Sequence, residues 1–402
     1  MIGKIKDSLK YITFKDFLDI FIFILLLLPT LFYKLYLKAR NKKIWLICEG
    51  KKDARDNGYV LFQYIREKDK DLPVYYAIDK KCPSYDKVKK YGNIISFGSL
   101  KHWIYYMSAS KNISIHKSAS PNEKIFYVLH YYKIVNGHRI FLQHGVTMNN
   151  VSYLHYKKTN FELFICGAAP EYKYILENFG YPSNRVCYLG FPRFDRLWNR
   201  NINPKQIVLM PTWRSWLGRE TNALISKINF EETEYYKVYQ GLLTDSDLLS
   251  FLEEKNITFY FYPHSKMEKY IHLFQSTSPN IKIVNAETAD IQDLIAESAL
   301  MITDYSSVSI DFAYMKKPLI YYQFDQKEFR ENHLQVGYFS YEKMGFGPVL
   351  YKRADVIQKI KSYVTENYTL EENYAKNIES FFTLRDSHNC ERIYKKIAEL
   401  DQ

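Results

Sequence analysis

Residues 285–325 read NAETADIQDLIAESALMITDYSSVSIDFAYMKKPLIYYQFD, and this stretch decides the fold. An acidic segment that predicts a helix leads into an apolar strand at 299–303, and the turn 304–307 follows. A helix with an apolar face over 308–315 and a second apolar strand over 319–322 come next. Strand, helix and strand in this order predict a βαβ unit with two parallel strands.

The turn of this unit carries two adjacent hydroxyls, Ser306 and Ser307. They can cap the following helix, whose first N–H groups and positive dipole end then point outward. A helix start of this kind binds phosphate, so the turn is a candidate anion site. An ordinary N-cap is the alternative interpretation.

Strands and helices alternate along most of the chain. A first series of apolar runs predicts strands at 43–50, 74–79, 93–99, 112–118, 139–145, 161–167 and 185–190, with a helix over 53–67. A second series lies at 206–213, 257–265, 281–286, 299–304 and 318–325, after a polar stretch at 198–205 that suits a linker. The pattern predicts an α/β protein with two doubly wound Rossmann-type domains, 43–198 and 199–402, facing a cleft. We expect the terminal helix to pack back.

The segment 1–42 differs from the rest. Residues 20–33, IFIFILLLLPTLFY, are uncharged, but they are fewer than the roughly 20 that a spanning helix needs, and Pro29 interrupts them. Lysines and arginine flank them at Lys4, Lys6, Lys10, Lys15, Lys34, Lys38, Arg40, Lys42 and Lys43. This predicts a peripheral or monotopic helix at the cytoplasmic face, each ammonium group contributing about 1 kcal/mol on anionic lipid. A spanning helix, a core helix and a helix that docks on a partner are the alternatives.

Charge and cysteine content restrict the partners. The net charge of +12 favours anionic partners, but basic and aromatic residues show no repeated register, so we expect no nucleic acid. The five cysteines are dispersed and form no CxxC pair, which indicates a reducing, cytoplasmic setting.

Polar residues follow several strands directly. His144, next to Gly145, suits a general base that takes a proton from a hydroxyl, although a hydrogen-bonded structural histidine is the alternative. His264, with Lys266 two residues on, suits stabilisation of charge on a leaving phosphate.

Arginines and carboxylates near these strand ends complete the candidate set. Arg214 can bind phosphate with two N–H groups, or form a salt bridge. Arg193 and Asp195 in GFPRFDRL suit a structural ion pair at a hinge, and Gly145 suits a close approach of chain segments.

Several other chemistries lack their motifs. The sequence has no GxGxxG after the first strand, no GxxxxGK[ST], no HExxH and no GxSxG. Its histidines also have no cysteine or carboxylate neighbours at metal-ligand spacing. We therefore predict neither a metal nor a cofactor.

Five motifs together resemble one enzyme family. They are the HG pair at 144–145, LGFPRFDRL at 189–197, MPTWR at 210–214, YPHSKM at 262–267 and ITDYSSVSIDFAYMKKPLIYY at 302–322. This set is similar to the CDP-glycerol glycerophosphotransferases, which include teichoic acid primases and polymerases. DSHNCER at 386–392 resembles that family's DGxxxxR ending, with Ser387 where glycine is usual, and Thr303 stands where serine is common.

The resemblance implies a GT-B fold and a CDP-activated polyol phosphate donor. It implies that the polyol phosphate is transferred to a hydroxyl of a lipid-linked acceptor and that CMP is released. It implies that His144 is the base and that His264 stabilises the pyrophosphate. It further implies donor phosphate or nucleotide binding by a set of residues on the second domain: Arg214, Lys266, Asp304, Ser306, Ser307 and Asp311. Glycerol or ribitol as the polyol, and teichoic acid or capsule as the polymer, stay open.

Two other functions are compatible with these residues. A GT-B glycosyltransferase that moves a sugar from a nucleotide donor would share the cleft and the helix start. A membrane adaptor or nucleic-acid-binding module without catalysis would suit the charge, and it predicts that His144 and His264 can be replaced without effect.

Overall fold

The protein is described by a computed structural model for residues 13–132, 135, 137–218, 229–332 and 337–400. The chain divides into two compact units. Unit 1 contains the described residues of 1–144, 152–195 and 386–402, and unit 2 those of 145–151 and 196–385. The chain therefore passes from unit 1 to unit 2 between residues 195 and 196, whereas the sequence predicted this boundary between 198 and 199. The segment that begins at Asp386 belongs to unit 1 again.

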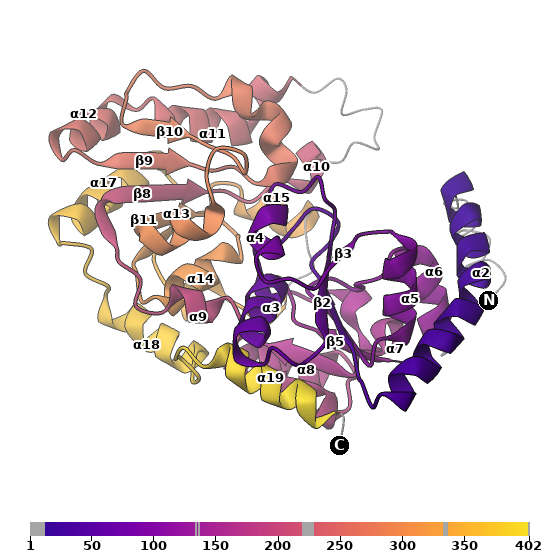
Figure 1. The fold of residues 1–402 in the computed structure, drawn as a ribbon. Coiled ribbons are helices and arrows are strands. Elements are labelled where there is room, and N and C mark those ends of the chain that lie inside the picture. Colours follow the sequence, from indigo (N-terminus) through magenta and orange to yellow (C-terminus); the bar gives the residue numbers. More distant parts are fainter. Residues whose placement is uncertain (1–12, 133–134, 136, 219–228, 333–336, 401–402) are drawn as a thin grey trace. The chain divides into compact units, whose positions relative to one another are not determined.

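Unit 1 is built on a seven-stranded parallel sheet in the order β3-β2-β1-β4-β5-β6-β7 (Figure 1). Each predicted strand of the first series is present. Their bounds are β1 Trp45–Cys48, β2 Val74–Ile78, β3 Ile94–Ser96, β4 Lys111–Ser114, β5 His138–Phe141, β6 Leu163–Cys166 and β7 Val186–Tyr188.

Successive side chains along each strand point to opposite faces of this sheet, and helices cover both faces. Trp45 and Ile47 share a core with α3 and α19, whereas Leu46 and Cys48 share the other core with α2, α5 and α6. The helices of unit 1 are α2 Phe14–Ala39, α3 Asn57–Lys68, α4 Tyr85–Lys89, α5 Leu100–Ser108, α6 Glu123–Tyr131, α7 Tyr156–Thr159, α8 Ala169–Asn178 and α19 Asn389–Glu399, with α9 Phe194–Leu197 at the crossing.

Unit 2 has a six-stranded parallel sheet in the order β10-β9-β8-β11-β12-β13. Its strands are β8 Asn203–Met210, β9 Thr258–Phe261, β10 Ile281–Ile283, β11 Ser298–Thr303, β12 Leu319–Tyr322 and β13 Val349–Leu350. Its helices are α10 Ser215–Gly218, α11 Glu234–Leu243, α12 Ser246–Glu254, α13 Ile291–Glu297, α14 Val308–Tyr314, α15 Gln326–Asn332, α16 Tyr341–Met344, α17 Arg353–Thr365 and α18 Glu372–Phe381.

The stretch 285–325 folds as predicted. The acidic segment forms α13, where the Asp290 side chain accepts a hydrogen bond from Gln292 N, and β11, α14 and β12 complete a parallel βαβ unit. The expected linker 198–205 is shorter than predicted, because Asn203–Met210 already form β8.

In each unit the strand order reverses beside the first strand, between β1 and β4 in unit 1 and between β8 and β11 in unit 2. Doubly wound sheets bind ligands at the carboxyl ends of the strands at this reversal. The predicted site residues His144, Thr212–Arg214 and 304–307 follow β5, β8 and β11.

Helix α2 is longer than the uncharged run suggested. It continues through Pro29 for 26 residues, and its first turn is closed by a capping box of Thr13 and Asp16. By length and composition it could cross a membrane, and 17% of its most apolar window is buried. The expected basic residues Lys4, Lys6 and Lys10 lie outside the described residues.

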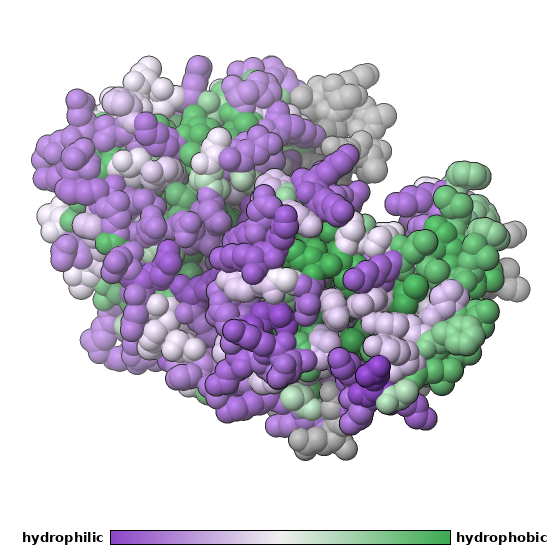
Figure 2. Space-filling model, viewed as in Figure 1, coloured by the Kyte–Doolittle hydropathy of each residue, from purple (hydrophilic) through white to green (hydrophobic). Residues whose placement is uncertain are grey.

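One face of α2 packs against α5 and α6 through a few buried residues, among them Leu26, Thr30 and Leu37. The other face exposes apolar side chains along its whole length (Figure 2). These are Phe14, Phe17, Leu18, Ile20, Phe21, Ile24, Leu25, Leu27, Leu28, Leu31, Phe32, Leu35 and Tyr36.

Candidate active site

The chain turns sharply just before His144. Gln143 has a φ of +60°, a left-handed conformation that is uncommon for a residue with a side chain. Its buried amide donates to Ile165 O at 2.7 Å and to Glu171 Oε1 at 2.9 Å, and its own carbonyl accepts from Asn57 Nδ2 at 2.8 Å. These bonds fix the turn, so His144 is presented at the surface of unit 1 beyond the end of β5.

The hydrogen bond of His144 determines which ring nitrogen is available. Nδ1 lies 3.4 Å from the carbonyl oxygen of Ile115, an acceptor, so this nitrogen carries the proton of the neutral ring. Nε2 is then unprotonated. An exposed imidazole whose Nε2 is bare can accept a proton from a hydroxyl.

A second histidine lies beside it. His116 follows β4, and its ring centroid is 5.3 Å from that of His144. Burial of its ring, and then the proximity of His144, lower the pKa of His116 below its ordinary value. The sequence predicts a strand over 112–118 that includes His116, but β4 ends at Ser114 and His116 lies beyond it. The signal for His116 was its position after the strand that pairs with the strand before His144.

His264 has the opposite arrangement in unit 2. It caps the 3-10 helix Ser265–Leu273, and its Nδ1 accepts the backbone N–H of Lys266 at 3.1 Å. Nδ1 is therefore unprotonated, and Nε2 carries the proton of the neutral ring. Burial and the neighbouring Lys266 lower the pKa of His264 to about 4, so at neutral pH it is an uncharged N–H donor.

Lys266 lies over an aromatic ring on the next strand end. Its Nζ is 3.5 Å from the ring centroid of Trp213, whose centroid in turn lies 6.2 Å from that of His264. The cation–π contact positions the ammonium group on the same side of unit 2 as His264.

Arg214 is fully buried between two carboxylates. Its guanidinium donates to Asp304 Oδ2 at 2.8 Å and to both oxygens of Asp325, at 2.5 and 3.0 Å, as well as to Thr212 O. Burial opposes its charge, but Asp304 and Asp325 outweigh this and raise the pKa of Arg214 well above its usual value. Four of the five guanidinium N–H groups are thus used inside unit 2.

The ring faces around this guanidinium close the cluster. They belong to Tyr235, Tyr305, Phe324 and Phe329. Asp304 also accepts from Thr212 N, Tyr239 Oη and Tyr305 N, so it too is buried in this network. The cluster therefore joins the ends of β8, β11 and β12, and it fixes the turn that follows β11.

Ser306 and Ser307 lie half-buried at that turn, and α14 begins at Val308. Ser306 Oγ accepts from Val308 N at 3.3 Å, whereas the Ser307 side chain makes no capping bond. Asp311 is buried in the first turn of α14. Gly145 belongs to unit 2 and lies against this turn, since a Cβ there would be 2.9 Å from Ser307 Oγ.

Arg193 and Asp195 stabilise unit 1. Arg193 Nη1 is 2.9 Å from Asp56 Oδ1, next to the start of α3. Asp195 accepts from the backbone N–H groups of Asn389 and Cys390, both at 2.8 Å, and so caps α19. Arg392 of the DSHNCER motif pairs with Asp386 at 2.8 Å, which closes the start of the same helix.

The chain matches the family model for CDP-Glycerol:Poly(glycerophosphate) glycerophosphotransferase over residues 30–399. Minor teichoic acid biosynthesis protein GgaB of Bacillus subtilis (strain 168) is 36% identical over 372 residues, which are 90% of this chain and 40% of GgaB. A teichoic acid poly(glycerol phosphate) polymerase of Bacillus spizizenii is 24% identical over 90% of this chain and 93% of that protein.

Solved structures share the fold. The wall teichoic acid polymerase TagF superposes with a TM-score of 0.66 at 17% identity, covering 90% of each chain. A putative UDP-N-acetylglucosamine 2-epimerase from Listeria monocytogenes superposes with a TM-score of 0.55 at 12% identity, over 89% of this chain and 96% of that one.

Two units, each with a parallel α/β sheet, are thus a fold that this chain shares with both solved structures. The chain is a member of the CDP-glycerol glycerophosphotransferase family. It spans less than half the length of GgaB.

Proposed function

We propose that this protein transfers glycerol phosphate, or a related polyol phosphate such as ribitol phosphate, from a CDP-activated donor to a hydroxyl of a lipid-linked acceptor. The product would be a teichoic acid or capsular polymer. Family membership over residues 30–399 supports the reaction. The structural observation that carries it is that Nδ1 of His144 faces a carbonyl acceptor, whereas Nδ1 of His264 accepts a backbone N–H.

In this reaction an acceptor hydroxyl attacks the phosphorus that bears the polyol. Nε2 of His144 takes the hydroxyl proton, the new O–P bond forms, and the bond from that phosphorus to the bridging oxygen breaks, so CMP leaves. No other group gains or loses a proton before CMP departs. The exposed ring and bare Nε2 of His144 support this role.

The donor phosphates are proposed to bind to unit 2. His264 offers an uncharged Nε2–H to a phosphate oxygen, and Lys266 adds a positive charge. Ser306 and Ser307 offer hydroxyls and helix-start N–H groups, with Asp311 bracing their helix. Arg214 and Asp304 act through the turn that they fix rather than by direct contact with the donor.

We propose membrane association through α2, in the plane of the bilayer at its cytoplasmic face. The helix is about 39 Å long at 1.5 Å per residue, and contacts near both of its ends belong to the same unit. At one end Asp16 pairs with Lys124 of α6 at 2.7 Å, and at the other Leu37 is buried in the core shared with α5. A helix bound to unit 1 at both ends lies along that unit and presents its apolar face to lipid.

A donor screen tests the reaction. The protein is incubated with CDP-glycerol, CDP-ribitol or a panel of nucleotide sugars, and with a lipid-linked disaccharide. CMP release and the product mass are measured. We expect CMP only with a CDP-polyol, and the number of added polyol phosphates separates priming from polymerisation. Release of a nucleotide from a sugar donor alone would refute the proposal in favour of a glycosyltransferase.

Variants of the two histidines test the mechanism. We expect His144→Ala and His264→Ala each to lower turnover by about 10²- to 10⁴-fold with the fold intact. His272→Ala is the matched control, because His272 is an exposed histidine of the same 3-10 helix as His264. Near-normal turnover in both test variants would contradict the assigned roles.

A further inference from the structure

Two adjoining cavities lie in unit 1 beside the end of α2. One has a volume of about 400 Å³ and the other about 300 Å³. They share the lining residues Lys34, Lys43, Ser108 and Ser110, and we call them together the amino-edge pocket.

The pocket is positively charged. Lys34, Lys38 and Lys42 line it, and among the described residues no carboxylate forms an ion pair with any of the three. Lys43 lines both cavities as well. Several ammonium groups on one small concave surface favour an anion of high charge density, such as a phosphate.

The pocket wall also has an unused hydrogen-bonding group. Ser108 Oγ is buried and has no partner among the described residues. Neighbouring Ser110 Oγ, in contrast, donates to Ile44 O at 3.1 Å. An unpaired hydroxyl next to lysines is suited to an additional phosphate oxygen, because leaving it unpaired in the folded protein is costly.

The position of the pocket separates it from the proposed reaction. Its lining residues Lys43, Ser110 and His138 stand at or just before the first residues of β1, β4 and β5. His116 and His144 follow the last residues of β4 and β5, so they lie at the opposite edge of the same parallel sheet. A phosphate in this pocket is therefore not the phosphate that reacts.

The apolar face of α2 leads directly to the pocket. Lys34 and Lys38 lie on the same helix as the exposed side chains of Leu31, Phe32 and Leu35. An amphiphile with an anionic head could place its head among the lysines and its tails along this face.

We propose that the amino-edge pocket binds the headgroup phosphate of an anionic phospholipid whose acyl chains lie along α2. This rests on the proposed membrane association and is independent of the transferase reaction. Bound lipid would fix the depth and rotation of unit 1 at the bilayer, with the start of α2 at the edge of the sheet where His144 lies.

Vesicle binding tests the charge requirement. The full chain is mixed with phosphatidylcholine vesicles with or without phosphatidylglycerol, and bound protein is measured by sedimentation. We expect the double variant K34Q/K38Q to bind anionic vesicles about 30-fold more weakly, from about 1 kcal/mol per lysine. Its binding to neutral vesicles, which reports the apolar face alone, should not change.

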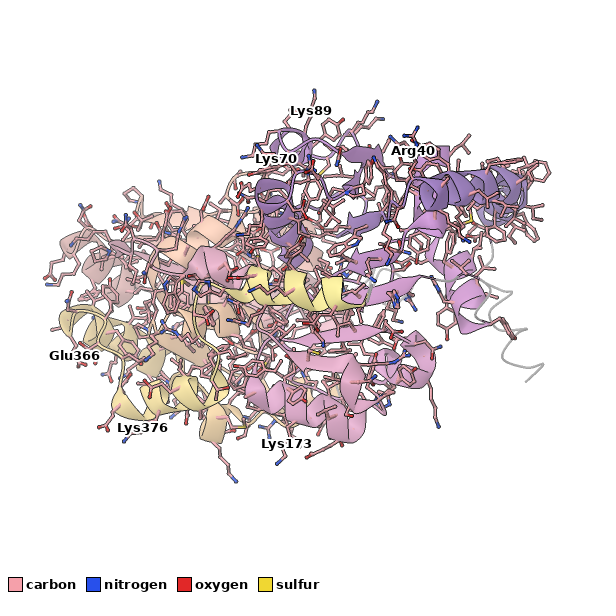
Figure 3. All side chains as sticks on the ribbon, turned by 60° about the horizontal axis from the view of Figure 1, so that its bottom comes forward. Arg40, Lys70, Lys89, Lys173, Glu366 and Lys376 are labelled. Atoms are coloured by element: carbon pink, nitrogen blue, oxygen red, sulfur yellow. The ribbon has the colours of Figure 1, made fainter. Side chains whose placement is uncertain are left out.

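The double variant K70Q/K89Q is the matched control. Both lysines are exposed on unit 1 but lie away from the end of α2 that Arg40 marks (Figure 3). Equal weakening by the two double variants would overturn the proposal, since it would mean that only the net charge matters.

Titration with a soluble lipid distinguishes binding in the amino-edge pocket from a general attraction between anionic lipid and the basic surface. Dihexanoyl-phosphatidylglycerol, below the concentration at which it forms micelles, is titrated calorimetrically. We expect saturable binding to one site, weakened in Ser108→Val, which removes the unpaired hydroxyl and keeps every charge. Unchanged binding in Ser108→Val, with folding verified by circular dichroism, would overturn the proposal. So would displacement by an equal concentration of inorganic phosphate, because the site would then recognise a free anion.

Discussion

At the scale of single residues, the two histidines differ in what their Nε2 atoms can do. A backbone carbonyl accepts a hydrogen bond from Nδ1 of His144, whereas a backbone N–H donates a hydrogen bond to Nδ1 of His264. The proposed base and the proposed donor would thus differ through a single local hydrogen bond each. The sequence indicated both histidines, but not this difference, because it depends on loop geometry.

A pair of substitutions can test whether His264 acts as an N–H donor. A glutamine side chain keeps an N–H donor of similar reach, whereas alanine removes it. We expect His264→Gln to retain at least tenfold more turnover than His264→Ala, measured as CMP release at saturating donor. If the two variants were equally impaired, a donor role for the Nε2–H would be contradicted.

His116 offers a second prediction at this scale. Its ring lies beside that of His144, so we infer that it limits the orientations of that ring. We expect His116→Ala to lower kcat about tenfold with little change in the KM for the donor, because the donor phosphates are proposed to bind to unit 2. His116→Phe, which keeps a ring without a titrating group, should restore most of kcat. Failure of this rescue would show that packing alone does not explain its effect.

At the scale of elements, the strand pattern was the most predictable feature. Buried parallel strands are continuous apolar runs, and each predicted run became a strand. β13 was missed because two residues are too few to give a pattern. The length of α2 was underestimated because its polar ends are stabilised by tertiary partners, as when Asn122 donates to Asp19 at 2.7 Å. No property of residues 13–19 alone reveals these contacts.

Two ion pairs of unit 2, one buried in the Arg214 cluster and one exposed, should contribute very differently to the free energy of unfolding. Asp325→Asn removes a charge that faces the buried guanidinium, so we expect a loss of about 3–5 kcal/mol in the free energy of unfolding. Glu379→Gln breaks the exposed pair with Lys316 and should lower the free energy of unfolding far less than Asp325→Asn does. Urea denaturation of both variants measures this, and similar losses would contradict the role assigned to the cluster.

At the scale of the whole molecule, the sequence predicted two doubly wound units and the edge of each sheet that carries polar residues. The sequence led us to expect a terminal helix that packs back, and residues 386–400 belong to unit 1, where Asp195 caps α19. It also placed Arg214 among the donor ligands, because an arginine at a strand end suits phosphate. In the structure the Arg214 guanidinium is paired with the carboxylate of Asp325, which lies 111 residues further along the chain. Only the folded chain brings these two groups together.

Acid is expected to weaken unit 1. Burial lowers the pKa of His102 to about 4 and that of His130 to about 3, from 6.5 in the unfolded chain. The unfolded state therefore binds more protons as the pH falls through 6.5, and the folded state loses stability. Glu49 acts in the opposite direction, because burial raises the pKa of its carboxyl group to about 7 and the folded state takes up this proton first.

The sum of these effects gives a net prediction. Each of the two buried histidines lowers the free energy of unfolding of unit 1 by on the order of 2 kcal/mol at pH 5. Glu49 raises it by a similar amount and so offsets one histidine. The free energy of unfolding of unit 1 should therefore fall by about 2 kcal/mol between pH 7 and pH 5. Hydrogen exchange, which resolves the two units, is the appropriate measurement. The loss should shrink in His130→Gln, since this variant keeps a buried amide that does not titrate. An unchanged pH dependence in that variant would mean that His130 is charged in the folded protein, against its buried contact with Tyr106 Oη at 2.8 Å.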